Sequence, residues 1–260
     1  MNSLAEPKKW EKFFWPLLAT ALLLALWHYA VAFTGTKIFP SPLDIKNGIA
    51  ELIRKQVLWR DIIDSLRRVA IGFGAATVIG IPLGLILGWY PAANKVVNPV
   101  LQILRPISPI AWIPVAIILL GVGDHAAISL IFLGALFPII VASVDGVSNV
   151  PSVFRLAGRN FGLGPFRLLT RVVFPAALPK IIVGLRIALG IAWLVVVAAE
   201  MIAVDSGLGY LVIDSRNSGK RYDLVVAAML IIGLIGLVLD TGFRRLEKIK
   251  SVRWGFRDDS

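Results

Sequence analysis

The residue types that carry out most protein chemistry are scarce in this chain. It has no cysteine, and its two histidines, His28 and His125, lie far apart. Disulfides, thiolate nucleophiles and thiolate metal sites are therefore excluded, and the histidines lack the spacing of a metal site. His28 lies among apolar residues, where a hydrogen-bonded or interfacial histidine is favoured. No nucleophile, acid–base pair or metal set converges, so we predict no enzyme activity, no catalytic residue and no bound metal.

Three charged residues lie within long apolar segments: Arg186, Glu200 and Asp240. An arginine at the centre of a membrane helix costs about 2.5–3.5 kcal/mol on insertion scales, and less near the membrane surface. We therefore expect Arg186 to extend to that surface. We expect Glu200 to pair or hydrogen-bond within the helix bundle, and Asp240 to pair with Arg244, one turn later. Glu200 is also a candidate for the lining of a pathway through the membrane.

The elements that hold these residues belong to a very apolar chain. Of its 260 residues, 57% are hydrophobic and 17% are charged, which leaves too little polar surface for a soluble domain. Several apolar runs have about the 20 residues with which an α-helix crosses a bilayer core. We predict an all-α integral membrane protein, a single domain over residues 1–260, with six transmembrane helices at about 14–34, 69–89, 107–121, 126–144, 181–203 and 224–243.

Membrane topology explains the formal net charge of +11. Lys and Arg flank apolar segments and are not interleaved with stacking aromatic residues, which argues against a nucleic-acid partner. With the N-terminus inside, the inner segments carry 16 Lys and Arg and the outer segments carry 10, so both termini are expected in the cytoplasm. A cleaved signal peptide is the alternative for the first segment, but its apolar core of about 20 residues exceeds the usual length.

Two further segments have recognisable patterns. From Ile45 to Val57, apolar residues recur at helical spacing with charges between them. This pattern predicts an amphipathic helix, either in the membrane interface or packed on the outer ends of the bundle. Pro109 and Pro114, with Trp112 between them, break any regular helix at the start of the third span. Irregular backbone at membrane depth can line a cavity, so these three residues are candidates for the pathway lining, and a simple kink is the alternative.

The long inner segment between the fourth and fifth spans is apolar and basic, unlike an ordinary loop. Residues 153–161 and 165–173 can each form a short helix, since Pro165 suits a first helical turn. Gly162-Leu163-Gly164 between them permits a sharp bend. Apolar residues on such a projecting pair of helices need a partner groove.

This segment resembles the cytoplasmic loop of the permease subunits of ABC importers. The loop signature is Glu-Ala-Ala, three residues, Gly, nine residues and then Ile-x-Leu-Pro. Here Leu156-Ala157-Gly158 is followed after three residues by Gly162, and after nine more by Val172-Val173-Phe174-Pro175. Spacing, glycine and proline match, whereas Leu156 stands in place of the glutamate. Any role of that carboxylate at an ATPase surface is therefore absent.

Three other stretches, which begin at Ser65, Leu104 and Ala198, are similar to the nitrate/sulfonate/taurine/bicarbonate branch of these importers. The resemblance implies a type I importer (MetI-like) permease fold, in a bacterial cytoplasmic membrane and in contact with lipid. It also implies a small, anionic solute. The implied partners are a second permease copy, two cytoplasmic ATPase subunits and an external solute-binding protein. The residues expected to couple to the ATPase are Ala157, Gly158, Arg159, Gly162 and Pro165.

The chain has no G-x-x-x-x-G-K-[ST] loop, so we expect ATP and Mg to bind to partner subunits and no cofactor to bind to this chain. A stand-alone channel or secondary transporter is the alternative. It predicts transport without ATPase partners, and more charged or unwound sites within the membrane.

Overall fold

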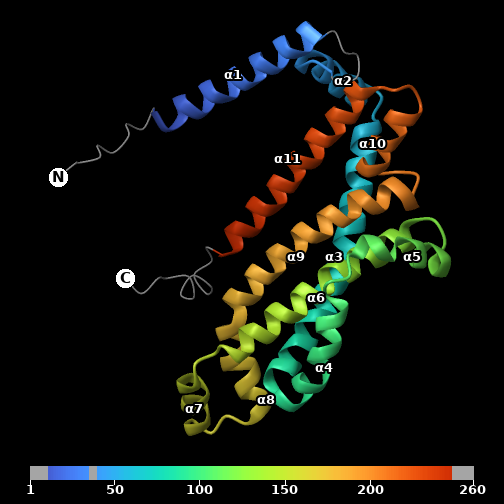
Figure 1. Cartoon of the computed structure of the whole chain (residues 1–260). Helices are drawn as coiled ribbons and strands as arrows, with labels where there is room; N and C mark the ends of the chain where they lie inside the picture. The colour runs from blue at the N-terminus through green and yellow to red at the C-terminus, as the bar shows by residue number, and fades with distance from the viewer. Residues whose placement is uncertain (1–10, 35–39, 248–260) are drawn as a thin grey trace.

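The computed structural model describes residues 11–34 and 40–247, and every regular element in these ranges is helical. Three long helices pack side by side at the centre, namely α3 (Val57–Trp89), α6 (Asp124–Ser148) and α9 (Phe174–Ala203). Figure 1 shows α11 (Tyr222–Glu247) along α9, while α1 (Glu11–Thr34) leans away from the bundle. The prediction of an all-α membrane protein is confirmed for the described residues.

Short helices cap the two ends of the bundle. In Figure 1, α2 (Pro42–Arg54) and α10 (Leu208–Asn217) lie at one end, and α7 (Ser152–Asn160) and α8 (Pro165–Leu168) lie at the other. We call these the α2/α10 end and the α7/α8 end. The amphipathic pattern from Ile45 corresponds to α2, which buries Ile45 and Leu52 and packs on α11 and α3.

Four helices within the described ranges are long and apolar enough to cross a membrane: Val57–Trp89, Asp124–Ser148, Pro165–Ala203 and Tyr222–Arg245. They contain the predicted second, fourth, fifth and sixth spans. Helix α1 covers the predicted first span, although its apolar stretch, Leu17–Val31, is shorter. The basic residues Lys8 and Lys9, and the basic segment from position 248 onward, lie outside the described residues.

The third span is a broken element. Its parts are α4 (Pro91–Leu104), the 3₁₀ turn η1 (Pro109–Trp112) and α5 (Ile113–Leu120), and the two halves are bent by 81°. Ser108 caps η1 by accepting a hydrogen bond from the amide of Ile110. Residues 90–106 are counted with the inner segments in the sequence, where the apolar stretch 96–104 could also extend the third span. In the structure they form α4, which with η1 and α5 has the form of a broken span or a re-entrant loop. The apolar face of α4 and the prolines after it explain the difference.

Small residues allow the three central helices to approach closely. Along α3, Gly72, Gly80, Gly84 and Gly88 lie on one buried face against α6. A Cβ atom at position 84 would stand 2.3 Å from the Cβ of Ser143. Membrane helices lack a strong hydrophobic drive to associate, so such close backbone packing supplies much of their attraction. On the other side of α6, a Cβ atom at Gly184 would stand 2.0 Å from the Cβ of Ala142.

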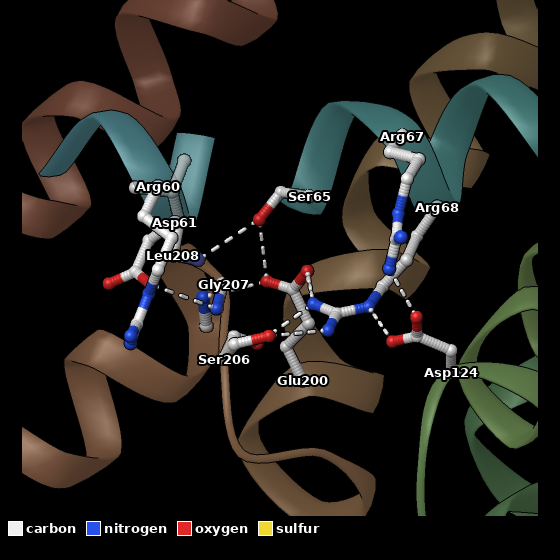
Figure 2. Close-up of polar contacts among 11 residues, drawn as sticks. Arg60, Asp61, Ser65, Arg67, Arg68, Asp124, Glu200, Ser206, Gly207 and Leu208 are labelled. Atoms are coloured by element: carbon white, nitrogen blue, oxygen red, sulfur yellow. Dashed lines mark hydrogen bonds and ion pairs between the residues drawn. The ribbon is translucent and has the colours of Figure 1, made fainter. Parts of the chain in front are cut away.

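A buried ion-pair network fastens the same three helices at the α2/α10 end (Figure 2). Arg68 of α3 donates from Nη1 to Glu200 of α9 at 2.7 Å and from Nε to Asp124 of α6 at 2.8 Å. It also donates to the backbone oxygen and the hydroxyl of Ser206, at 2.8 and 2.7 Å. The side chains of Arg68 and Glu200 are 2% and 0% exposed, so the pair is closed off from water.

The second carboxylate oxygen of Glu200 organises the turn that leads into α10. It accepts from the hydroxyl of Ser65 at 2.8 Å and from the amide of Gly209 at 2.9 Å. Gly207 has φ +105°, and a Cβ atom there would lie 2.4 Å from the Glu200 carboxylate, so only glycine fits. The turn between α9 and α10 is therefore built around this one side chain.

A second set of charges holds α2 at the same end. Arg221, which precedes α11, contacts Glu51 of α2 at 2.7 Å, and Lys55 contacts the other oxygen of Glu51 at 2.6 Å. The hydrogen bonds from Arg221 and then from Lys55 lower the pKa of the Glu51 carboxyl to about 2. The carboxylate thus stays ionised at neutral pH and ties α2 to the start of α11.

Gly184→Ala is expected to destabilise the bundle. The new methyl group overlaps Ala142, which has no flexible side chain to move aside, and such overpacking costs about 1–3 kcal/mol. Thermal unfolding of the purified protein in detergent measures the effect as a midpoint several degrees lower. Gly190→Ala is the matched control, because it lies on the same helix with nothing within 4 Å, and it should leave the midpoint unchanged or slightly higher. Equal midpoints for the two variants would show that α6 and α9 do not pack this closely.

Glu200→Ala is expected to cost about 3–5 kcal/mol of stability, because it leaves a buried guanidinium without its buried partner. The double variant Arg68→Met/Glu200→Leu removes both charges. Its loss of stability should be smaller than the sum of the losses of Arg68→Met and Glu200→Leu made singly. The exposed Lys55 serves as control, since Lys55→Met removes a solvated charge and should change little. If the stability losses of the two single variants add up to the loss of the double variant, Arg68 and Glu200 do not interact.

Candidate functional site

The turn between α7 and α8 has the geometry of a Schellman motif. Its two hydrogen bonds run from the amide of Leu163 to the oxygen of Gly158 and from the amide of Gly162 to the oxygen of Arg159. Gly162 has φ +74°, the left-handed conformation in which a helix commonly ends. The predicted glycine bend is therefore present at Gly162, whereas Gly164 has φ −66° and simply leads into α8.

The two short helices pack tightly on each other. A Cβ atom at Gly158 would stand 2.4 Å from Cδ1 of Leu168, and both residues are buried. Arg155 donates to the backbone oxygen of Val147 at 2.7 Å, which ties α7 to the end of α6. These contacts make α7 and α8 one stiff unit, residues 152–168, which we call the coupling segment after the role that the sequence leads us to expect for it.

The coupling segment runs without a break into a membrane helix. After α8 the chain makes one π-helical turn, η2 (Leu169–Val173), and continues directly as α9. The sequence predicts a short helix that ends at residue 173 and a span that begins at 181, but the structure has one helical path from Pro165 to Ala203. Prolines 175 and 179 do not end it, because proline is tolerated in a first turn and within membrane helices. A force on α8 therefore acts directly on α9.

The coupling segment presents apolar and basic side chains to its surroundings. Phe161 is 87% exposed and Phe166 is 77% exposed, and Val153 and Leu156 are exposed beside them. The segment has arginines at positions 155, 159 and 167, and the sequence has no Asp or Glu between Asp145 and Glu200. Exposed aromatic residues among cations, away from the apolar spans, form a surface that needs a partner.

The residues expected to couple to a partner occupy two kinds of position. Ala157, Arg159, Gly162 and Pro165 are exposed on this surface. Gly158 is buried and instead lets α8 approach α7. Leu156, at the position of the family glutamate, is exposed next to them.

A row of hollows follows one face of α6. Their volumes are about 270, 190 and 310 Å³. The first lies between α4 and α6, the second between the α4/η1 bend, α6 and α9, and the third between α6 and α9. Polar or charged residues that line them are Asn94, Asn98, Gln102, Arg105, Asp145, Asn149 and Lys180. The row runs from mid-bundle to the α7/α8 end.

The expected pathway residues do not all lie on this row. Pro109 and Trp112 line its middle hollow, while Pro114 is exposed at the start of α5 and lines none of the three. Glu200 lies elsewhere, fully buried in the network around Arg68, because Arg68, Ser65 and Gly209 occupy its oxygens. Glu200 is therefore paired within the bundle, as we expected, and it does not line the three hollows.

The other intramembrane charges are also paired. Arg186, which we expected to extend to the membrane surface, contacts Asp240 at 2.5 Å and Glu247 at 3.3 Å, both on α11. Asp240 also pairs with Arg244 at 2.9 Å, as predicted. Sequence reasoning missed Arg68, although Asp61, Ser65 and Arg68 form a polar stripe at helical spacing beside an apolar run.

Comparison with known proteins gives the family. Residues 80–251 match the family described as "Binding-protein-dependent transport system inner membrane component". The chain is 44% identical over 184 residues to a putative ABC transporter permease of Methanocaldococcus jannaschii, covering 70% of this chain and 68% of that protein. It is 35% identical to the nitrate import permease NrtB of Synechocystis, covering 90% of this chain and 88% of that protein. It is 32% identical to the taurine transport permease TauC of Escherichia coli, covering 92% and 91%.

A solved structure agrees on the fold. An inward-facing conformation of the MetNI methionine ABC transporter contains a chain that superposes with a TM-score of 0.66 at 19% identity, covering 74% of this chain and 95% of that one. The predicted MetI-like fold is thus confirmed. With the family match over most of the bundle, the conclusion is direct: the chain belongs to the binding-protein-dependent ABC transporter permeases, the inner membrane components of these transport systems.

Proposed function

We propose that this chain is the membrane-spanning subunit of an ATP-driven importer and that its coupling segment docks into a groove of a cytoplasmic ATPase subunit. The observation that carries the proposal is the unbroken helical path from Pro165 to Ala203. It connects an exposed aromatic surface at one end of the bundle to the helix that lines two of the hollows. Closure of the ATPase subunits on ATP would therefore move α9 directly.

The α7/α8 end faces the cytoplasm in this proposal, and both chain termini lie on that side. The excess of Lys and Arg in the segments assigned to this side supports the orientation, and it remains when Lys95 and Arg105 of α4 are left out. At the opposite end, α2, α10 and the turn at Gly207 would face an external solute-binding protein.

The row of hollows along α6 is open on one side in the single chain. We infer that a second permease copy, identical in a homodimer, covers this side, so that the pathway runs between the two copies. The solute is a small molecule with an oxyanion group, in line with relatives named for nitrate, bicarbonate and taurine transport. Binding of solute and ATP then shifts the pathway between inward and outward exposure.

A stand-alone channel or secondary transporter is not favoured. Such a protein has no use for an exposed aromatic and basic surface outside the membrane, and the family match points to a partner-dependent system. Two measurements distinguish these hypotheses. An importer permease co-purifies with an ATPase that has nucleotide-binding motifs, and its complex takes up solute only when ATP is present.

Phe161→Ala is expected to release the ATPase subunits. Phe161 is 87% exposed, so its loss leaves the fold intact but removes an aromatic anchor worth about 2 kcal/mol or more, roughly thirty-fold in affinity. Co-purification of the ATPase with a tagged permease measures the loss. Leu119→Ala removes a similarly exposed apolar side chain on α5, 74% exposed, and should retain the ATPase. Full retention in the Phe161 variant would place the docking surface elsewhere.

Gly162→Val is expected to uncouple ATP hydrolysis from uptake. A β-branched residue at φ +74° costs at least about 1–2 kcal/mol, so the turn opens and α7 shifts on α8. Reconstituted complexes should continue to hydrolyse ATP while ATP-dependent uptake falls to near background. Gly164→Ala, at φ −66° with nothing within 4 Å, is the control and should transport normally. Normal uptake by the Gly162 variant would mean that this turn does not transmit the motion.

A further inference from the structure

Arg105 lies halfway through the membrane-spanning bundle, at the break between α4 and η1. Helix α4 starts just after Trp89 and Tyr90, which share a hollow with Arg159 and Pro165 of the coupling segment. Helix α5 ends near Gly123, whose amide donates to the backbone oxygen of Ala203 at the α2/α10 end. The bend is therefore at intermediate depth between the two ends.

The neighbours of Arg105 give the same depth. Arg105 lines one hollow with Gly134 and Pro138 of α6 and with Ile187 of α9, all near the middle of their helices. Gly134 lies against η1, since a Cβ atom there would stand 3.2 Å from Cγ of Pro109. Arg105 thus lines the part of the row of hollows nearest the middle of the bundle.

Arg105 differs from the arginines Arg68 and Arg186 of the long helices because it has no acidic partner. Arg68 pairs with Glu200 and Asp124, and Arg186 pairs with Asp240 and Glu247. No carboxylate in residues 11–34 or 40–247 forms an ion pair with Arg105, and the side chain is exposed to the hollows. A charged residue kept unpaired within a membrane bundle marks a water-filled pathway or a site for an ion of opposite charge.

The first hollow surrounds Arg105 with uncharged donors. Asn94, Asn98 and Gln102 follow one face of α4 and end at Arg105. Their amide groups can donate to oxygen atoms of an anion, and the planar guanidinium can donate two parallel hydrogen bonds to such a group. Asp145 is the one acidic residue in this lining, and it also lines the third hollow, together with Lys180. Positive charge therefore predominates along the row.

We propose that Arg105 is the anion-selecting residue of the pathway, a fixed cation at mid-membrane that attracts small oxyanions with a planar or trigonal group of oxygens and rejects cations. The proposal rests on the proposed function, because it places the pathway along α4, α6 and α9. It assigns selection within the membrane to this chain, in addition to any selection by the solute-binding protein. The side-chain amides of Asn94, Asn98 and Gln102 then donate hydrogen bonds to the anion as it moves to and from Arg105.

The absence of cysteine from the natural chain allows a direct test. In the assembled complex, Gln102→Cys places one thiol of the permease in the first hollow, three residues from Arg105 on the same helix face. The probes are two methanethiosulfonates of similar size, one with a sulfonate and one with a trimethylammonium group. The measured quantity is the ratio of their reaction rates with the permease thiol, read by mass of that subunit.

When each rate is divided by the rate of the same reagent with a small free thiol, the sulfonate reagent is expected to be the more favoured of the two. Positions three apart on a helix are about 5–6 Å apart at Cβ, so removing the charge with Arg105→Gln should lower the rate ratio by roughly fivefold or more. Arg105→Lys keeps the charge and should keep most of the ratio. Lys95→Gln removes the same charge from the same helix outside the hollow and should leave the ratio unchanged.

Two results would overturn the proposal: a thiol at position 102 that reacts with neither reagent, or a ratio that does not respond to Arg105→Gln. Either can occur in a complex that still binds its ATPase and takes up solute, in which case only the role of Arg105 fails. Conversely, if the hollow selects anions but the chain binds no ATPase, the proposed function fails and the role of Arg105 in anion selection remains.

Discussion

The guanidinium of Arg68 is the constraint on which the arrangement of this bundle depends. Through it, α3, α6 and α9 meet at one buried point, and the turn into α10 is folded around its partner Glu200. Buried ion pairs add little net stability compared with apolar packing, but they penalise every alternative register strongly. The network therefore fixes which faces of the three helices meet, and the glycine stripe of α3 then allows them to close along their length.

The two ends of the bundle differ in how they are held together and in what they expose. The α2/α10 end is held by buried charges and by the Arg221–Glu51 contact. The α7/α8 end presents exposed aromatic residues on a stiff turn that continues into α9. A motion applied at the exposed end is carried by one helix to the fastened end, while the hollows and Arg105 lie between the two.

The sequence predicts the helical class, the long spans and the glycine bend at Gly162, because each depends on local composition or on one residue's backbone freedom. It does not predict the partner of Arg68, since Glu200 is 132 residues away and only the fold brings them together. It predicts that Glu200 pairs within the bundle but also leaves it as a candidate for the pathway lining, because a lone acid in an apolar run has the same local pattern in both cases. The continuity of α8 with α9 is hidden by prolines, which usually end helices in water but are tolerated here.

If the proposed pair of permease copies forms, we expect each copy to move as one rigid piece when ATP closes the coupling segments, so that its two ends move in opposite directions. Spin labels at Asn160→Cys, at the α7/α8 end, and at Val122→Cys, at the opposite end, report the distance between the two copies of an assembled complex. On trapping with ATP and vanadate, rigid motion of each copy should shorten the distance at position 160 and lengthen the distance at 122. A distance at 160 that shortens while the distance at 122 stays fixed would contradict it, because the motion would then be absorbed within each copy.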